Sequence, residues 1–183
     1  MLGRGCVVVL GLLAWAVPVA GENIVFERFD NAPEQRWGYV SDGVMGGVSQ
    51  GGAVFGQANE VSSVHLQGVV STQNNGGFIQ VRRLLPDALP VATSGLTLTV
   101  RGNGETYYLF VRTKDMTRPW YYYNASFVAG PEWTQVSIPL DALQPSHAHL
   151  AERVDPEQVI SIGLVAYGRD HDADLRVSQI SLF

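Results

Sequence analysis

Apolar and polar residues alternate along much of this chain with a period of two. The apolar positions of this pattern include Leu96, Leu98 and Val100; Val136, Ile138 and Leu140; Ile160, Ile162, Leu164 and Ala166; and Leu175 and Val177. A period of two places one side of a β-strand on a core and the other side towards solvent. After Val177 the pattern slips by one position before Ile180 and Leu182, which indicates either a bulge or the end of the strand.

Turn-forming residues separate these runs. The turn segments are Gly102-Asn103-Gly104, Arg118-Pro119, Gly130-Pro131 and Gly168-Arg169-Asp170. Many short strands divided by turns are typical of a β-sandwich or barrel. Helical periodicity is scarce, and we expect only two short helices, Pro86–Leu89 and Pro156–Val159, the second of them capped by Asp155. The pattern therefore predicts an all-β fold.

Residues 1–21 have the character of a secretory signal peptide. Arg4 supplies a positive charge, an uncharged apolar run over residues 7–17 follows, and the small residues Ala20 and Gly21 come next. This is the order of a signal peptide, with cleavage after Ala20 or Gly21. The apolar run is short for a membrane span, which favours a cleaved signal peptide over the alternative, an uncleaved N-terminal anchor. We therefore expect an exported protein, periplasmic or extracellular, with no membrane span after cleavage.

The remaining residues, 22–183, are expected to form a single domain. The one cysteine, Cys6, lies in the leader, so we expect no disulfide and no thiolate site in the mature chain. Absent cysteines in an exported chain are more typical of a bacterial periplasm or exterior than of a eukaryotic secretome. The formal net charge is −5 and Lys114 is the single lysine, so the chain lacks the basic field that nucleic acid or anionic lipid requires.

Two glycine-rich segments stand apart from the alternating pattern. Residues 37–49 have the sequence WGYVSDGVMGGVS, and residues 74–82 have the sequence NNGGFIQVR. Glycine pairs permit positive φ angles and close approach of the backbone, and asparagine tolerates left-handed conformations. Both segments are therefore expected to be tight loops that lead into strands. No Lys-Ser or Lys-Thr pair follows the glycines, and neither does a helical pattern, which argues against a phosphate-binding loop.

Together the two segments resemble the complex I intermediate-associated protein family, known in mitochondria as an assembly factor for the respiratory NADH:ubiquinone oxidoreductase. The resemblance covers residues 24–183 and includes Gly102–Tyr107, Glu132–Leu140, Ile160–Leu164 and Ile180–Leu182. It implies a jelly-roll β-sandwich of the galactose-binding-like type, similar to some carbohydrate-binding modules. It also implies a binding or assembly function with a protein partner.

The candidate binding residues of the two segments are Trp37, Asp42, Met45, Asn74, Asn75 and Arg82. Asp42 has two interpretations: it binds a ligand hydroxyl or cation, or it caps backbone N–H groups of the glycine turn. The second is favoured because Asp-Gly turns need such a cap. Trp37 and Met45 are better explained as core or loop anchors than as ligand contacts, and Asn74 belongs to a strand-entry turn. Arg82 is a candidate ion-pair partner for Asp42.

Aromatic side chains concentrate in two neighbouring strands and their turn. They are Tyr107, Tyr108, Phe110, Trp120, Tyr121, Tyr122 and Tyr123. Adjacent tyrosines of a strand point to opposite faces, so about half of them must leave the core. A register with Tyr107, Tyr121 and Tyr123 outside, beside Trp120, would give a platform for a sugar ring. The opposite register, with Tyr122 outside, fits the pattern equally well, and cross-strand pairing that only stabilises the sheet is the remaining interpretation.

The sequence gives no pattern for a cofactor, a metal site or a catalytic centre. Residues 170–174 form an acidic loop, for which a solvated turn is favoured over a calcium site because the Gly and Glu of a calcium loop are missing. His147 and His149 lack a spaced third ligand for zinc. We therefore predict a non-enzymatic module that holds a protein partner. Carbohydrate binding by an exposed aromatic face is the alternative, and a carboxylate-dependent hydrolase is a weaker third.

Overall fold

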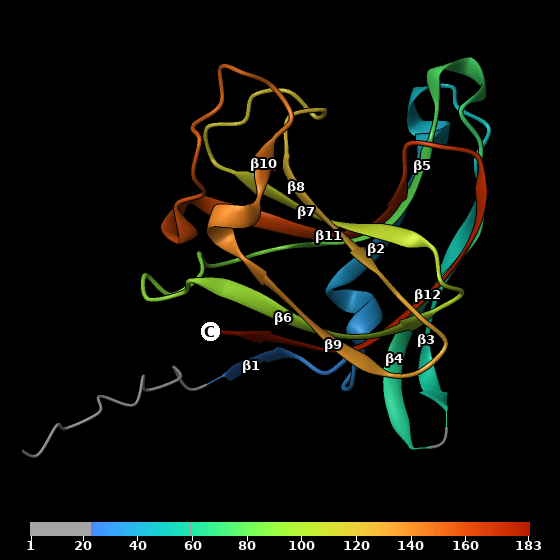
Figure 1. Ribbon diagram of the computed structural model, residues 1–183, viewed down its shortest axis with the longest axis horizontal. Helices are drawn as coiled ribbons and strands as arrows, with labels where there is room; N and C mark the ends of the chain where they lie inside the picture. Colours follow the sequence, from blue (N-terminus) through green and yellow to red (C-terminus); the bar gives the residue numbers. More distant parts are fainter. Residues whose placement is uncertain (1–22, 59) are drawn as a thin grey trace, which may run out of the picture.

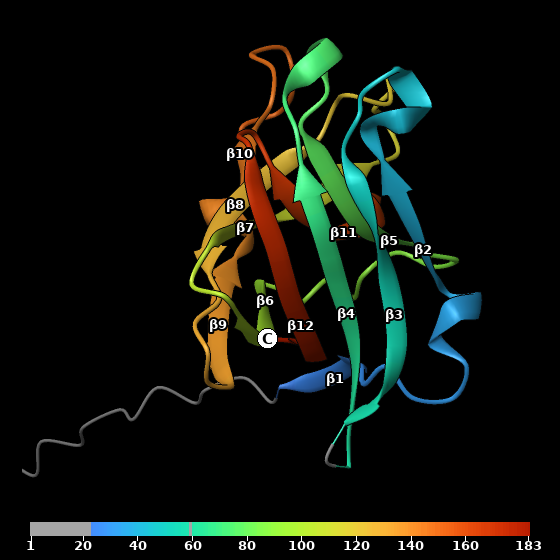
Figure 2. The same ribbon diagram turned by 90° about the vertical axis from the view of Figure 1, so that its right-hand side faces the viewer.

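The computed structural model describes residues 23–58 and 60–183. They form two antiparallel sheets that pack face to face, with only short 3-10 helices among the described residues (Figures 1 and 2). The all-β sandwich expected from the alternating pattern is therefore confirmed. No helix of the described residues has the length and apolar character needed to cross a membrane. The expected signal peptide, residues 1–21, lies outside the described residues.

The first sheet has the strand order β3-β4-β12-β6-β9, and β1 also pairs with β12. Its strands are β1 (Ile24–Glu27), β3 (Gln50–Ala58), β4 (Val61–Val70), β6 (Gly95–Gly102), β9 (Thr134–Pro139) and β12 (His171–Leu182). Strand β12 shifts register against β6 between Val177 and Gln179. The slip in the apolar pattern is therefore a bulge within one strand, and not the end of it.

The second sheet has the strand order β10-β8-β7-β11-β5-β2, so β2 is one of its edges. Its strands are β2 (Trp37–Ser41), β5 (Phe78–Leu84), β7 (Thr106–Thr113), β8 (Tyr123–Val128), β10 (Gln144–Pro145) and β11 (Val159–Tyr167). The 3-10 helices are η1 (Pro33–Gln35), η2 (Asp42–Met45), η3 (Gln73–Asn75), η4 (Leu140–Ala142) and η5 (Pro156–Gln158).

One of the two expected helices forms and the other does not. Helix η5 begins as expected, with the Asp155 carboxylate accepting a hydrogen bond from the Glu157 N–H. The expected helix over Pro86–Leu89 is wrong, because this segment hydrogen-bonds to another part of the chain. The N–H of Leu89 donates to the carbonyl of Pro156, and Leu89 itself is buried.

The core lies between the sheets and is filled by alternate residues of the strands. On β7, Tyr107, Leu109 and Val111 point inward and are at most 1% exposed. Leu109 pairs in register with Leu164 of β11, which pairs with Val81 of β5. Apolar side chains therefore form rows across the sheet, and the residues between them form the outer face of the second sheet.

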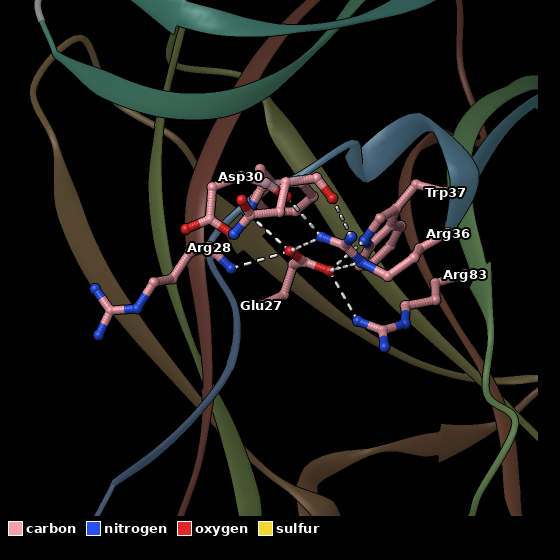
Figure 3. Close-up of polar contacts among 8 residues, drawn as sticks. Glu27, Arg28, Asp30, Arg36, Trp37 and Arg83 are labelled. Carbon is pink, nitrogen blue, oxygen red and sulfur yellow. Dashed lines mark hydrogen bonds and ion pairs between the residues drawn. The ribbon is translucent and has the colours of Figure 1, made fainter.

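A buried carboxylate fixes the start of the edge strand β2 to β1 and β5. The side chain of Glu27 is 2% exposed and accepts hydrogen bonds of 2.8–3.2 Å from Arg36, Trp37 and Arg83 (Figure 3). The backbone N–H groups of the next two residues also donate to it. Burial favours the neutral acid, but the hydrogen bonds from Arg36, Trp37 and Phe29 outweigh it, so the pKa of Glu27 lies below its usual value.

Replacing this carboxylate by its amide, Glu27→Gln, leaves two guanidinium groups without their anion. We expect the free energy of unfolding at pH 7 to fall by about 3 kcal/mol. When one partner of a buried ion pair is removed, the remaining charge stays buried without the interaction that compensated for its desolvation. Urea unfolding followed by tryptophan fluorescence measures the change. Glu152→Gln, at an exposed position, is the matched control and should change stability by less than about 0.5 kcal/mol.

The same pair of proteins tests the pKa of Glu27. Because the folded pKa is lowered, the contribution of the ionised carboxylate is complete above the unfolded value of about 4.3 and is lost as the pH falls below it. The stability difference between the parent protein and Glu27→Gln should therefore be constant near neutral pH and narrow below about pH 4. A difference that widens on acidification would contradict a lowered pKa.

Candidate functional site

Three loops meet at one end of the sandwich, which we call the loop end and define as residues 42–49, 71–77 and 168–170. The first follows β2 and contains η2, the second precedes β5 and contains η3, and the third joins β11 to β12. Figure 2 shows η2 in cyan and η3 in green side by side at the top of the molecule. The loop end therefore contains the glycine pairs of both glycine-rich segments, whose other residues lie on β2 and β5.

Asp42 joins the two glycine-rich segments. It is fully buried, and its carboxylate accepts hydrogen bonds from the Ser49 N–H at 3.0 Å and the Ser49 hydroxyl at 2.5 Å. From the second segment the N–H groups of Gly77 and Phe78 donate at 2.6 and 3.3 Å. Burial acts to raise the pKa of Asp42, but these hydrogen bonds lower it. Asp42 therefore acts as a backbone cap, and no oxygen of it is left open for a ligand cation.

The expected ion pair between Arg82 and Asp42 is wrong. Arg82 lies four residues beyond Phe78 on β5 and directly follows the buried Val81, so it is on the outer face of the sheet, where it pairs in register with Gly38 and Gly163. Asp42 follows the last residue of β2, at the opposite end of the pairing between β2 and β5, and its side chain points into the loop end. Alternation along β5 therefore separates the two side chains, and backbone N–H groups take the place of the guanidinium.

Gly47 and Gly76 leave room for the Asp42 carboxylate. A Cβ atom at either position would overlap side-chain atoms of Asp42. The φ angle of Gly76 is −77°, which any residue adopts. These glycines are therefore required by the close approach of the carboxylate and not by an unusual backbone angle.

The first loop exposes large apolar side chains to solvent. Val44 and Met45 are 77% and 60% exposed, and we call them the apolar tip. They lie on η2, which is capped at its start by the Ser41 hydroxyl and ends at Gly46 with a φ of 92°. The expectation that Met45 is a core or loop anchor is therefore wrong, because its side chain faces water. Two large apolar residues exposed on a hydrogen-bonded turn are available for contact.

Asp170 fixes the second loop to the third. Its carboxylate accepts hydrogen bonds from the N–H and the hydroxyl of Thr72, both at 2.7 Å, and these bonds lower its pKa. Asn74 and Asn75, also candidate binding residues, are exposed in this loop with left-handed φ angles of 56°. Over residues 23–58 and 60–183, no group of three or more His, Cys, Asp or Glu is arranged to hold a metal ion.

The aromatic strands have the register opposite to the one used for the sugar platform. Tyr107 and Tyr123 are at most 1% exposed and point into the core, so their assignment to an outer platform is wrong. The Tyr107 hydroxyl donates to Asn103 and accepts from the Asp174 N–H. Its burial raises the pKa of Tyr107 to about 12. Odd-numbered positions of β7 face the core because the apolar Leu109 follows Tyr107 on the same side.

Trp120 and Tyr121 lie in the connection between β7 and β8. Trp120 is 50% exposed, whereas Tyr121 packs partly against the core, with the rings of His147 and His149 at 4.8 and 4.6 Å from it. The guanidinium of Arg112 donates to three carbonyl groups of this connection and so fixes its path. Tyr121 is therefore a packing residue at the edge of the core.

Four other aromatic residues lie on the outer face of the second sheet. We call Tyr108, Phe110, Tyr122 and Tyr167 the aromatic cluster. Phe110 stacks on Tyr122 with ring centroids 4.0 Å apart, and Tyr108 meets Tyr167 edge to face at 5.7 Å. The hydroxyl of Tyr122 donates to that of Tyr167, and burial raises the pKa of Tyr122. Much of each ring is therefore covered by a neighbouring ring.

Sequence reasoning missed Val44 and Tyr167. The signal for Tyr167 was present, because Leu164 and Ala166 are core positions and the next residue must face outward. Val44 stood next to a named candidate, Met45, inside a turn where large apolar residues have no core to join. Trp37, by contrast, is 2% exposed and donates to Glu27, so it is an anchor as expected.

Comparison with known proteins gives a family match and several similar folds. The model of the family named complex I intermediate-associated protein 30 matches residues 26–177. A search of curated proteins found no match. The family 11 carbohydrate-binding module of the cellulosomal cellulase Lic26A-Cel5E of Clostridium thermocellum is similar, with a TM-score of 0.73 and 12% identity over 88% of this chain and 94% of that one.

Two further solved structures share the fold. A family 30 carbohydrate-binding module has a TM-score of 0.51 at 15% identity, covering 75% of this chain and 92% of that one. An exo-β-agarase has a TM-score of 0.56 at 10% identity, covering 88% of this chain and 25% of that one. At these identities the likeness shows the fold alone, and it confirms the expected jelly-roll β-sandwich.

The packing of Asp42 against its glycines predicts the effect of a single methyl group. Gly76→Ala should destabilise the protein by about 1–3 kcal/mol in urea unfolding, because the added Cβ atom overlaps the buried carboxylate. Gly52→Ala, on β3, is the matched control, since a Cβ atom there meets no atom within 4 Å. The prediction fails if the two variants have the same stability.

Proposed function

Because this chain belongs to the complex I intermediate-associated protein 30 family, which covers residues 26–177 of it, we propose that it is a non-catalytic module that holds a protein partner at its loop end. The family is named for association with an intermediate of complex I. From that name we take the mode of action, the binding of a protein, and not the identity of the partner. We further propose that the partner lies outside the cytoplasm, in the periplasm or beyond, because residues 1–21 have the order of a signal peptide.

The observation that carries this proposal is the apolar tip. Val44 and Met45 are adjacent and largely exposed, and apolar surface of this kind gains about 25 cal/mol per Å² when a partner removes it from water. Methionine is enriched in protein interfaces because its flexible side chain fits varied surfaces. The Asp42 hydrogen bonds arrange the turn before binding, which lowers the entropy lost on association.

The state of the buried carboxylates supports a role without catalysis. Glu27 and Asp42 are the buried acidic residues among those described, and each has a lowered pKa and several hydrogen-bond donors. A carboxylic acid that acts as a general acid needs a pKa raised towards neutral pH, which is the opposite shift. A carboxylate that acts as a nucleophile or base needs a free lone pair that faces a substrate. Both side chains serve the fold instead.

The tip proposal predicts that a charge at Val44 abolishes partner binding. A photo-crosslinking residue at Met45, in the chain expressed with its own leader, should capture a protein that mass spectrometry can identify. Purified partner should then bind Val44→Asp at least tenfold more weakly than the parent protein in a biosensor assay, since a buried unpaired charge costs more than about 1.4 kcal/mol.

Val54→Asp is the matched control, because Val54 is 54% exposed on β3 and away from the loop end. It should bind the partner as the parent protein does. If Val44→Asp binds the partner as tightly as the parent protein does, or if both variants lose the same affinity, the apolar tip is not the surface that binds the partner.

Glycan binding is the second candidate function, and the aromatic cluster is the observation that favours it. Tyr108, Phe110, Tyr122 and Tyr167 lie on the outer face of the second sheet, and Tyr167 is 37% exposed. Exposed aromatic faces stack on sugar rings. Because the four rings pack against one another, little of each ring face is open to a sugar. We therefore rank protein binding at the apolar tip above glycan binding at the aromatic cluster.

A glycan array separates the two candidates. If sugars bind at the aromatic cluster, the parent protein should give specific signals that a Tyr108→Ala/Tyr167→Ala variant loses by at least tenfold. Trp120→Ala should keep them, because Trp120 lies in a loop outside the cluster. An array without specific signals would leave the protein partner as the proposed ligand.

A further inference from the structure

A hollow of about 530 Å³ lies where the edge strand β2 pairs with β5. Gly38 and Val40 of β2 line it, together with Arg82 and Leu84 of β5 and the nearby Arg36. Its volume lies within the range of small-molecule sites. We call it the arginine hollow, and neither the family likeness nor the apolar tip accounts for it.

Arg82 has no charged partner in this hollow among the residues that the structure describes. No ion pair or hydrogen bond joins its guanidinium to another side chain within residues 23–58 and 60–183. Glycines occupy the paired positions on both neighbouring strands, Gly38 on β2 and Gly163 on β11. A Cβ atom at Gly38 would meet no atom within 4 Å. The space beside Arg82 is therefore open on the side of β2.

The charges around the hollow do not balance. Arg36, Arg82 and Arg83 line it, whereas the acidic groups are Glu34 in the lining and Glu27 behind it, which holds Arg36 and Arg83. Arg82 is therefore the arginine of this lining that no carboxylate of the described residues pairs with, in a chain whose formal net charge is −5. The Nε atom of Arg83 is also buried without a hydrogen-bond partner within the described chain.

The excess charge extends along the outer face. Phe110 of β7 faces Arg82 across Gly163 of β11, and Arg112 lies two residues further along β7 on the same outer face. The guanidinium of Arg112 binds carbonyl groups and no carboxylate among the described residues. Burial is the first cause that lowers the pKa of Arg112, and the positive charge of Arg82 is the second. Two uncompensated guanidinium groups thus lie on the same face.

We propose that the arginine hollow is a binding site for a monovalent carboxylate, which the guanidinium of Arg82 holds through two parallel hydrogen bonds. A planar carboxylate matches the fork of a guanidinium, and a single negative charge pairs with Arg82, the one arginine of the lining that no carboxylate of the described residues contacts; Arg112 is not part of the lining. Val40, Leu84 and Pro86 offer apolar surface to the rest of the ligand. The carboxylate belongs either to a small organic acid or to an acidic side chain of a peptide, and this site is independent of the apolar tip.

An NMR titration of the purified mature protein tests this site. The probes are 3-phenylpropionate, its neutral analogue 3-phenylpropionamide, and an acetylated, amidated Gly-Gly-Glu-Gly-Gly peptide. We expect saturable shifts of the Arg82 Nε–H signal and of the Gly38 amide with a carboxylate probe and none with the amide. The tighter of the phenylpropionate and the peptide identifies the source of the carboxylate.

Variants show whether Arg82 carries the binding. Arg82→Gln should weaken binding of the carboxylate at least tenfold, and Arg82→Lys should lie between, because it keeps the charge and loses the paired hydrogen bonds. Arg153→Gln removes the same charge from an exposed loop and should bind as the parent protein does. Retained signal dispersion in Arg82→Gln confirms that it folds.

Three results would overturn the site: no saturable shift with either carboxylate, equal affinity for the amide and the acid, or equal weakening in Arg82→Gln and Arg153→Gln. Val44→Asp should bind the carboxylate probe normally. A failure of the apolar tip to hold a partner therefore leaves this test intact, and a failure here leaves the tip intact.

Discussion

The buried carboxylate of Asp42 is the interaction on which the arrangement of the loop end depends. It holds segments that are 35 residues apart in the chain through donors on Ser49 and Gly77. Four hydrogen bonds compensate for the removal of an ionised group from water, and they keep the group ionised. Without this carboxylate, several backbone N–H groups would be buried without an acceptor, so the two loops and the side chains they present would lose their common support.

A second carboxylate plays the same part at the other end of β2. Glu27 binds the indole of Trp37 at the start of this strand, and Asp42 follows Ser41 at its end. An edge strand of five residues is thereby fixed at both ends by buried, ionised groups. The apolar tip and the arginine hollow lie at these two ends, so each proposed binding surface rests on a buried carboxylate that is itself fully engaged.

Much of the fold followed from the sequence because alternation reports which face of a strand is buried. Leu98 and Leu164 could be placed in the core, and the slip after Val177 could be recognised as either a bulge or the end of the strand. The site was less accessible, for a physical reason. Adjacent residues of the same type, such as Tyr122 and Tyr123 or Arg82 and Arg83, give no alternation of their own, so only the packed sheet decides which of each pair faces inward. The hydrogen-bond partners of Asp42 could not be predicted either, because they lie on a second loop that is distant in sequence, and residue spacing does not reveal contacts between distant loops.

Hydrogen exchange at the amides of Ser49 and Gly77 shows whether Asp42 makes the loop end a preformed structure. Both N–H groups donate to the carboxylate in the absence of any partner. We expect these amides to exchange as slowly as those of the central strand β7. In Asp42→Asn they should exchange at least tenfold faster, while β7 is less affected. Rapid exchange of both amides in the parent protein, at the rate of an open loop, would contradict this expectation.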